Sequence, residues 1–593
     1  MEVRHRTVEA MNDPAGGPRS SAFEWIFAAT LFAAGFGYAF YTKHVWEDYF
    51  ITFRHSKNFA EGRGLVYHEG ERVHGFTSPI GVLLPAFFHV VAGKPSDFEH
   101  ALWMFRVVGA LAYAAAGFLV IRILRSAAPN EPLLPWAGAL LFLVDFKSLA
   151  FSMNGQETGL MLFFLAWIVR ILQRGGDVHW KALGVAWAGL QWTRPDGCVF
   201  IAATAIATLV FNGGRPRMRL LEGFVKAGLL SLLLYSPWLI GTTIYYGSPI
   251  PHTVLAKAGT VPPITSLFGP FPTGLAERIR ERAGGLFEPI YAFSGGWPEW
   301  AVRFARGVGI AGLVWWMIPF RGPYAAFSRW MGLSGFLLAL YLCFILMFPW
   351  YFPPIALIVA LSLVSGAFTA PRMFILVIVG SWMFVEMWDK DYFERIAKGK
   401  LPCKPREAWI MASAAAAAFL SPRFLSKPRI ALAAVLGVCA TLGFIASGSW
   451  KQIAVQQERI ETGHRRKIGE WLKANAKPNE TIFLESLGYI GYFSEGRMRD
   501  WPGLVAPEVV EARKISGGRM MAGAVLIRPD WMVLRKAVEY ELAMANPWFR
   551  ENYEVAREFN AADDLKRDYP DLPGLGYPLY DAHYYVLRKR GLR

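Results

Sequence analysis

Two adjacent carboxylates, Glu47 and Asp48, follow the first long apolar run of the sequence, in the stretch WEDYFITFRHSKN. An acidic pair suits the removal of a proton from a hydroxyl group, because one carboxylate raises the pKa of its neighbour and keeps it competent as a base. Charge at a membrane edge is costly unless it is paired or hydrated, so it indicates function by default. The structural alternative is an ion pair between Asp48 and Arg54, whose spacing is nearly helical.

Further polar residues interrupt apolar sequence at later points. Arg194 lies in TRPDG between two short apolar halves, where proline and glycine predict a broken helix that lines a cavity. We expect Arg194 and Lys257, with Arg54 in reserve, to bind an anion such as a phosphate. The other candidate substrate-binding residues are Asn58, Asn154, Glu157, Asp196, Tyr246, His252, Trp350 and Tyr351.

Each candidate also has an ordinary structural explanation. Arg194 could extend its charge to the membrane surface, and Glu157 could be a carboxylate favoured at a helix start. Trp350 and Tyr351 could belong to the aromatic belt of a membrane protein. The charged residues of the loop YYGSPIPHTVLAK could simply be hydrated. The sequence leaves both explanations open.

The elements that carry these residues are predicted to be membrane-spanning helices. Of the 593 residues, 54% are hydrophobic and 18% are charged, against about 25% charged residues in an average soluble domain. Apolar runs that approach the length of a bilayer span recur along the chain, and we expect about 11–13 spans. The net charge of +16 comes largely from short loops between these runs, which is typical of topology determinants. Nucleic-acid binding is therefore not expected.

The distribution of arginine predicts which loops face the cytoplasm. The first apolar run, residues 23–42, is predicted to be a retained span, although a cleaved signal peptide is an alternative. SPIGVLLPAFFHVVAG is too short for a comfortable span, and we expect it to be a juxtamembrane helix. With that choice, three successive basic loops face the cytoplasm and all the polar residues above face outward. The basic loop DKDYFERIAKGKLPCKPRE then also faces outward, which counts against the scheme.

The sequence predicts two domains. Residues 1–449 form the transmembrane domain, in which residues 43–100 make the first outer loop and the juxtamembrane helix. Residues 450–593 form a small soluble α/β domain, because no run there is long enough to span. GHRRKIGEWLKANAKPNE predicts an amphipathic helix, and TIFLES, WMVLRK and AHYYVLRK predict strands. The scheme places this domain outside the cytoplasm.

The first outer loop carries a pattern made of Glu47–Asp48, Phe50–Ile51, Phe53–Arg54, Asn58, Gly62, Gly64, Gly70 to Val73, Gly75, Thr77 and Pro79. This pattern resembles the first outer loop of bacterial GT-C glycosyltransferases, and most closely that of the terminal β-(1→2)-arabinofuranosyltransferase family. NGQET, TRPDG, YYGSPIPHTVLAKAG and FPWYFPP resemble later motifs in the expected order, and IFLESLGYIGYFSEGRMRDWPGL resembles the tail. The chain departs from the family at Glu47, which is usually Asp, and at His74 and His252, where Glu and Asn are common.

The resemblance implies a membrane enzyme of the bacterial inner membrane that uses a polyprenyl-phosphate sugar as donor, with arabinofuranose or another pentose favoured. The acceptor would be an extracytoplasmic glycan or lipid, and Asp48, with Glu47 beside it, would supply the catalytic base. No cofactor is implied. A carboxylate pair is able to hold a divalent metal, but nothing in the sequence requires one.

Two other functions remain open from the sequence. One is a transporter or flippase of lipid-linked sugars, although no inverted repeat is evident and the polar residues gather on one side. The other is a non-catalytic membrane scaffold, which would leave the acidic pair unexplained. The sugar, the acceptor, the linkage, the stereochemical outcome and the oligomeric state are not determined by the sequence.

Overall fold

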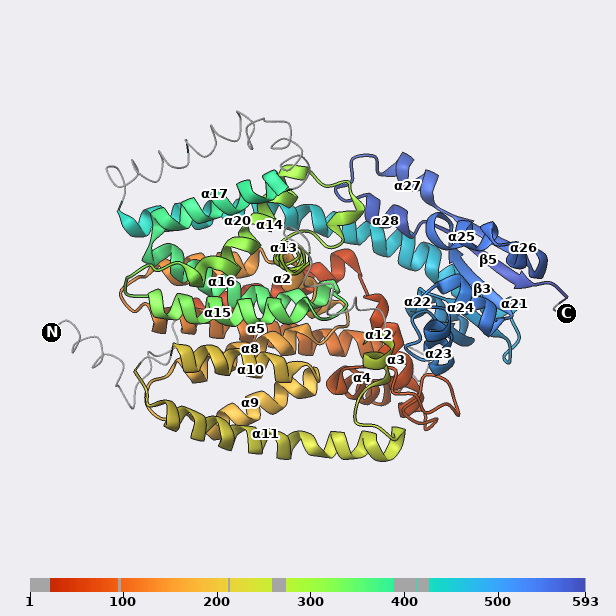
Figure 1. Cartoon of the computed structure of the whole chain (residues 1–593), viewed down its shortest axis with the longest axis horizontal. Helices are drawn as coiled ribbons and strands as arrows, with labels where there is room; N and C mark the ends of the chain where they lie inside the picture. Colours follow the sequence, from red (N-terminus) through yellow and green to blue (C-terminus); the bar gives the residue numbers. More distant parts are fainter. Residues whose placement is uncertain are drawn as a thin grey trace.

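The computed structural model describes residues 22–93, 98–211, 214–258, 274–388, 413 and 426–591. Long helices lie side by side in one body, and a domain with a small sheet lies at one end of them (Figure 1). A helical membrane protein with a C-terminal α/β domain is the fold class predicted from the sequence, and it is confirmed.

The number of spans differs from the predicted 11–13. Among the described residues, six helices are long and apolar enough to cross a membrane. They are α2 (Ala22–Thr42), α5 (Phe98–Ala127), α11 (Arg217–Tyr246), α15 (Ala325–Leu342), Pro349–Thr369, which contains α16 (Phe352–Thr369), and Lys427–Asn475, which begins with α20 (Lys427–Val455). A seventh span results if α6 (Leu133–Leu143) and α7 (Phe146–Met153), which meet at a 56° bend, are taken together.

Several predicted spans form shorter helices. The runs around residues 158–172 and QWTRPDG become α8 (Thr158–Gln173), α9 (Trp180–Thr193) and α10 (Gly197–Val210), of 14 to 16 residues each. Helices of this length do not reach across about 30 Å of hydrocarbon when they stand upright. The helical body also contains α14 (Glu299–Val314) and α17 (Pro371–Trp388). The predicted span at residues 407–420 lies outside the described ranges.

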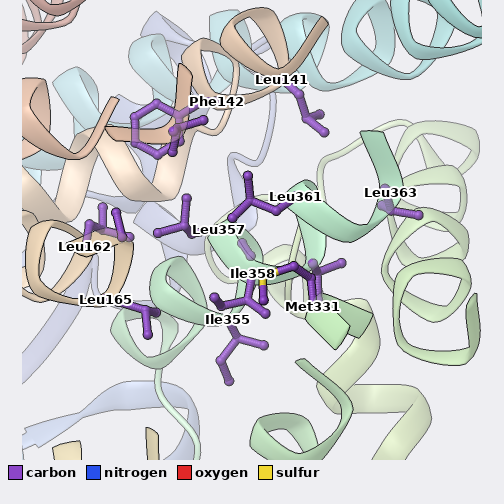
Figure 2. Close-up of a cluster of buried hydrophobic side chains, with 14 of the residues drawn as sticks. Leu141, Phe142, Leu162, Leu165, Met331, Ile355, Leu357, Ile358, Leu361 and Leu363 are labelled. Carbon is purple, nitrogen blue, oxygen red and sulfur yellow. The ribbon is translucent and has the colours of Figure 1, made fainter. Parts of the chain in front are cut away.

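The centre of the helical body is α16, which is buried along almost its whole length. Its sequence is apolar on every side, as expected of a helix with no solvent-facing stripe. Ile355, Leu357 and Ile358 pack against side chains from neighbouring helices (Figure 2). This packed centre fixes the start of α16, where two candidate site residues lie.

The predicted juxtamembrane helix is present as α4 (Pro79–Ala92) and packs against α3 (Glu47–Ala60). The Ser78 hydroxyl accepts a hydrogen bond from the Gly81 amide at 2.8 Å and caps the first turn of α4. Gly93 ends the helix in the left-handed conformation that suits glycine. Ser56 of α3 donates to the Val82 carbonyl at 2.8 Å, so the two helices are joined by a buried hydrogen bond.

The C-terminal domain contains a five-stranded sheet with the order β2-β1-β3-β5-β4. The strands are β1 (Thr481–Leu484), β2 (Arg497–Asp500), β3 (Trp531–Arg535), β4 (Tyr553–Asn560) and β5 (His583–Lys589). β1 is parallel to β2 and β3, whereas β5 is antiparallel to β3 and β4. The three predicted strands are β1, β3 and β5, and sequence reasoning missed the two edge strands.

Short helices surround this sheet and connect it to the helical body. They are α21 (Arg466–Asn475), α22 (Leu487–Ser494), α23 (Pro507–Ile515), α24 (Met520–Ile527), α25 (Glu541–Ala545), α26 (Pro547–Asn552), α27 (Ala562–Asp568) and α28 (Gly576–Tyr580). α20 continues through the π-helical segment Gln456–Arg465 into α21, so one 49-residue helix links the two parts without a flexible linker.

Candidate active site

The acidic pair forms the first turn of α3, directly after α2. Carboxylates are favoured there because the helix N-terminus carries partial positive charge. The Trp46 amide donates to the Asn154 carbonyl at 2.9 Å, which ties the start of α3 to the end of α7. Phe50 of α3 packs on Tyr489 and Tyr492 of α22, so the C-terminal domain also holds the helix. The pair is therefore rigidly placed.

Asp48 faces two cations and one carboxylate. Burial raises the pKa of Asp48 above its usual range; Lys257 and Arg194 lie near enough to lower it, and Glu485 near enough to raise it further. Among the described residues, no hydrogen bond or ion pair engages the Asp48 carboxylate, and the expected alternative, a pair with Arg54, does not form. A buried carboxylate with a raised pKa and no fixed partner is suited to accept a proton.

Arg194 lies between α9 and α10, where the sequence predicts a break. Its guanidinium donates to both Asp196 oxygens, at 2.9 and 3.2 Å, and lies 3.6 Å from a Glu157 oxygen. The guanidinium carbon also stands 4.5 Å from the centre of the Tyr351 ring. Two carboxylates thus surround Arg194 and offset much of its charge.

Lys257 comes from α12 (His252–Ala258), and its ammonium lies 5.1 Å from the centre of the Phe348 ring. Phe348 stacks on Trp350 with ring centres 4.5 Å apart. Trp350 in turn makes an edge contact with Trp46, the residue before the acidic pair, at 5.7 Å. An aromatic wall therefore runs from Lys257 past Trp350 to the start of α3, so Trp350 and Tyr351 lie in the same cluster as the charged candidates.

Glu47 has a different environment from Asp48. One Glu47 oxygen lies 3.0 Å from the Arg465 guanidinium, and the other accepts a hydrogen bond from the Gly488 amide at 3.2 Å. Arg465 also pairs with Glu461 at 3.0 Å and with Asp581 at 2.7 Å. Burial, partly opposed by Arg465, raises the pKa of Glu47 to about 8. Glu47 is therefore fastened to the C-terminal domain, whereas Asp48 is not.

Two predicted site residues of α3 lie outside this cluster and have structural contacts. Arg54 donates to the carbonyls of Gly491, Glu495 and Gly496 at 2.8 to 3.2 Å. Asn58 donates to the carbonyls of Val66 and Tyr67 at 2.8 and 3.1 Å. Arg54 thus joins α3 to the C-terminal domain, and Asn58 shapes the first outer loop.

Three further candidates lie around the ends of α7 and α11. The Asn154 side chain is buried, with no hydrogen-bond partner among the described residues. The Tyr246 hydroxyl donates to the Leu65 carbonyl at 2.5 Å, and its ring stacks on His74 with centres 4.6 Å apart. The His252 amide donates to the His74 carbonyl at 3.0 Å, so the two histidines that depart from the family pattern are neighbours.

Sequence reasoning missed two residues of the cluster, Glu485 and Arg465. Glu485 directly follows β1, at the carboxyl end of a parallel strand, where functional side chains commonly gather. Arg465 lies in the basic stretch GHRRK, and no local pattern distinguishes it from its neighbours. Among the described residues, no group of three or more His, Cys, Asp or Glu side chains is arranged to hold a metal ion.

Comparison with known proteins places this geometry in context. A family model described as a domain of unknown function, DUF8728, matches residues 451–583. The chain is 26% identical over 288 residues to a terminal β-(1→2)-arabinofuranosyltransferase of Corynebacterium glutamicum, which covers 44% of this chain and 40% of that protein. It is also 26% identical over 257 residues to the protein of the same name from Mycobacterium tuberculosis, covering 39% and 38%. The alignments thus span about 40% of the length of these relatives.

The fold is similar to that of a solved glycosyltransferase. The apo crystal structure of the Archaeoglobus fulgidus oligosaccharyltransferase superposes with a TM-score of 0.50 at 12% identity, covering 91% of this chain and 73% of that one. The resemblance predicted from the first outer loop is therefore confirmed: the chain is similar in sequence to the terminal β-(1→2)-arabinofuranosyltransferases and shares its fold with this oligosaccharyltransferase.

Proposed function

We propose that this chain is a glycosyltransferase that moves a sugar from a polyprenyl-phosphate donor to a glycan or lipid acceptor outside the cytoplasm. The observation that carries the proposal is that Lys257 and Arg194 both lie near enough to influence the Asp48 carboxylate, in a cluster joined by the contacts of the Phe348, Trp350 and Tyr351 rings. The names of the sequence relatives favour arabinofuranose, or another pentose, as the transferred sugar.

Asp48 is the proposed base. The acceptor hydroxyl attacks the anomeric carbon of the donor while Asp48 takes the hydroxyl proton, and the bond from that carbon to the phosphate oxygen breaks. Burial keeps the pKa of Asp48 above the usual range, which brings its basicity closer to the working pH. No other group holds the carboxylate in place among the described residues, so it is available to the acceptor.

The leaving group is a lipid phosphate, whose growing negative charge needs a cation in a water-poor site. Lys257 is the first candidate, since its ammonium lies against an aromatic face near Asp48. Arg194 is paired with Asp196 and Glu157, which offset its charge. We therefore assign it mainly to orienting the phosphate rather than to neutralising it. The ring of Tyr351, on which Arg194 lies, offers an apolar surface for the sugar.

The position of the cluster suits a membrane-anchored donor. The residues come from the ends of helices: after α7, between α9 and α10, and just before α16. These ends lie toward the C-terminal domain (Figure 1). A donor whose lipid tail lies among the helices would present its sugar at this height, and we propose that this side faces away from the cytoplasm.

Mass spectrometry of lipid that co-purifies with the protein tests the donor, and transfer from decaprenyl-phosphoryl arabinofuranose to an arabinan fragment tests the reaction. We expect a polyprenyl phosphate in the preparation and transfer that is lost in Asp48→Asn. A flippase would instead move the donor between leaflets of a vesicle without transferring its sugar, and with equal efficiency in Asp48→Asn. That result would contradict glycosyl transfer and would support transport of the donor instead.

A further inference from the structure

The buried ion network of the C-terminal domain reaches the protein surface at Glu485. Arg465 pairs with Glu47 at 3.0 Å and with Asp581 at 2.7 Å. Asp581 in turn accepts a hydrogen bond from Arg535 at 2.6 Å, and Arg535 pairs with Glu485 at 2.5 Å. The network therefore runs from one member of the acidic pair to Glu485. The side chain of Glu485 is 43% exposed, whereas both arginines are buried.

Arg535 has other partners and does not need Glu485 to balance its charge. Its guanidinium donates to Asp581 at 2.6 Å, to Glu539 at 2.8 Å and to the Ser486 hydroxyl at 2.7 Å. Asp581 and Glu539 are both buried, so two desolvated carboxylates already surround this one cation. Glu485 is the exposed third carboxylate, and Arg535 is its sole ion-pair partner among the described residues. Its direction is fixed, while much of its surface stays open to a ligand.

Glu485 lies beside the acidic pair because the backbone of α22 touches the first turn of α3. The Gly488 amide donates to a Glu47 oxygen at 3.2 Å, and a Cβ at residue 488 would overlap the Glu47 carbonyl, so the approach requires glycine. Glu485 precedes Gly488 by three residues, at the turn between β1 and α22. Burial raises the pKa of Asp48 and the charge of Glu485 raises it further, so the two carboxylates lie within electrostatic reach of each other.

An exposed aromatic ring, that of Tyr580, lies next to this carboxylate. The Arg535 guanidinium carbon is 5.1 Å from the centre of the Tyr580 ring, so the ring and the carboxylate contact the same arginine. Tyr577 of the same helix, α28, packs on Tyr291 with ring centres 4.6 Å apart, and Tyr291 stacks on Trp46 at 6.2 Å. These rings connect α28 to the start of α3. An exposed carboxylate beside an aromatic face fits a sugar, which has hydroxyl groups at its edge and apolar C–H groups on its face.

The charged neighbours of Asp48 differ in sign and in origin. Lys257 and Arg194 come from the helical body and suit the donor phosphate, whereas Glu485 comes from the C-terminal domain and repels a phosphate. We infer that Glu485 binds the acceptor, by accepting hydrogen bonds from hydroxyl groups of an uncharged sugar that stacks on Tyr580. The inference rests on the proposed function, because the acceptor hydroxyl must lie within reach of Asp48. Glu485 would thereby select a neutral acceptor over one that carries a phosphate or a carboxylate.

Calorimetry with a linear α-arabinofuranosyl tetrasaccharide and the full chain in detergent, without donor, tests this inference. We expect Glu485→Ala to weaken tetrasaccharide binding about tenfold, because a hydrogen bond to a charged group is lost. The matched control is Glu554→Ala. The Glu554 side chain is 38% exposed and pairs with Arg588 at 2.7 Å, but it lies on the edge strand β4. Equal affinities of the two variants, or no binding by the unmodified protein, would overturn the inference.

A second tetrasaccharide, whose terminal primary hydroxyl is oxidised to a carboxylate, tests the charge of Glu485. The unmodified protein should bind it more weakly than the neutral tetrasaccharide. Glu485→Gln should reduce this preference because the repulsion between like charges is removed, and Glu554→Gln should keep it. A purely structural role of Glu485 would weaken the binding of both sugars alike and leave their ratio unchanged, which would contradict the proposed selection.

Transfer kinetics separate this inference from the proposed reaction. Glu485→Ala should raise the KM for the tetrasaccharide about tenfold and leave the KM for the donor nearly unchanged. If transfer occurs and Glu485→Ala has the same acceptor KM as Glu554→Ala, only the inference about Glu485 fails. If the tetrasaccharide binds in a manner that depends on Glu485 and no sugar is transferred, only the proposed reaction fails.

Discussion

Arg465 lies 3.0 Å from Glu47, although 418 positions separate the two residues in the chain. The same guanidinium binds Glu461 and Asp581, so a buried ion network of the C-terminal domain ends at the first turn of α3. Asp48, the next residue, takes no part in that network and faces Lys257 instead. Two adjacent carboxylates thus have different tasks, one in holding the helix and one in the proposed chemistry.

Replacing the two carboxylates separately should distinguish these tasks. We expect Asp48→Asn to lower kcat about 10²- to 10⁴-fold, the range associated with a general base, and to leave the melting temperature nearly unchanged. Glu47→Gln keeps a hydrogen-bond acceptor for Arg465 and Gly488, so its kcat should fall less. Transfer assays combined with thermal melts measure both effects, and full activity of Asp48→Asn would exclude it as the base.

Removing the Arg465 guanidinium should lower the stability of the fold more than replacing it with a lysine ammonium. Arg465→Ala leaves Glu47, Glu461 and Asp581 without their shared partner, and loss of one member of a buried ion network costs about 3–5 kcal/mol. We expect Arg465→Ala to melt at a clearly lower temperature and Arg465→Lys to recover part of the loss.

If Arg465 also positions the acidic pair, Arg465→Lys should fold yet show a reduced kcat with a nearly unchanged KM for the donor. Arg466→Ala is the matched control, because the Arg466 side chain is half-buried at the surface and pairs with a single carboxylate, Glu470, in the next turn of the same helix. Equal stability losses in Arg465→Ala and Arg466→Ala would show that the network contributes little.

The raised pKa of Glu47 predicts how stability changes with pH. Because the folded protein holds this proton up to about pH 8 and the unfolded chain releases it near pH 4.5, the folded state binds more protons in this window. Stability should therefore fall as pH rises, by up to about 1.4 kcal/mol per pH unit from this group. The difference in melting temperature between Glu47→Gln and the unmodified protein should grow in favour of Glu47→Gln from pH 5 to pH 8. A pH-independent difference would contradict the raised pKa.

Two neighbours of Asp48 should shift the pH profile of kcat/KM in opposite directions. The base must be deprotonated, so activity should rise with pH through the pKa of Asp48. Lys257→Met removes a charge that lowers this pKa and should move the rising limb to higher pH. Glu485→Gln removes a charge that raises it and should move the limb to lower pH. Profiles normalised to their maxima separate these shifts from losses of binding, and shifts of the same sign in both variants would contradict the assignment.

Much of the fold follows from local patterns in the sequence. The apolar run at residues 23–42 is α2, and TIFLES, WMVLRK and AHYYVLRK contain the three central strands. The edge strands escaped prediction for physical reasons. β2 is four residues long and reads RMRD, and β4 is largely exposed on both faces, so neither shows a clear alternation of buried and exposed positions. Among the described residues, six helices are long and apolar enough to cross a membrane, fewer than the predicted 11–13 spans, because several apolar runs form helices shorter than a bilayer crossing.

The candidate site was predictable where a polar residue stood at the end of an apolar helix. Asp48 and Arg194 were singled out in this way, Lys257 was predicted as an anion ligand in an outer loop, and the structure places the three in one cluster. Arg54 and Asn58 looked similar in the sequence, but their partners are backbone carbonyls of other segments. The Glu47–Arg465 pair could not be read from the sequence, because it depends on how the C-terminal domain sits on α3.

Arg513 of α23, in the C-terminal domain, donates a hydrogen bond to the Ala256 carbonyl. Ala256 precedes Lys257, so α23 steadies the ammonium while Arg465 steadies the carboxylate pair. A single folded unit thereby sets the gap between opposite charges that belong to distant helices. A chain cut after residue 450 would lose both contacts at once. The helical body alone would then no longer fix the distance between the Lys257 ammonium and the acidic pair.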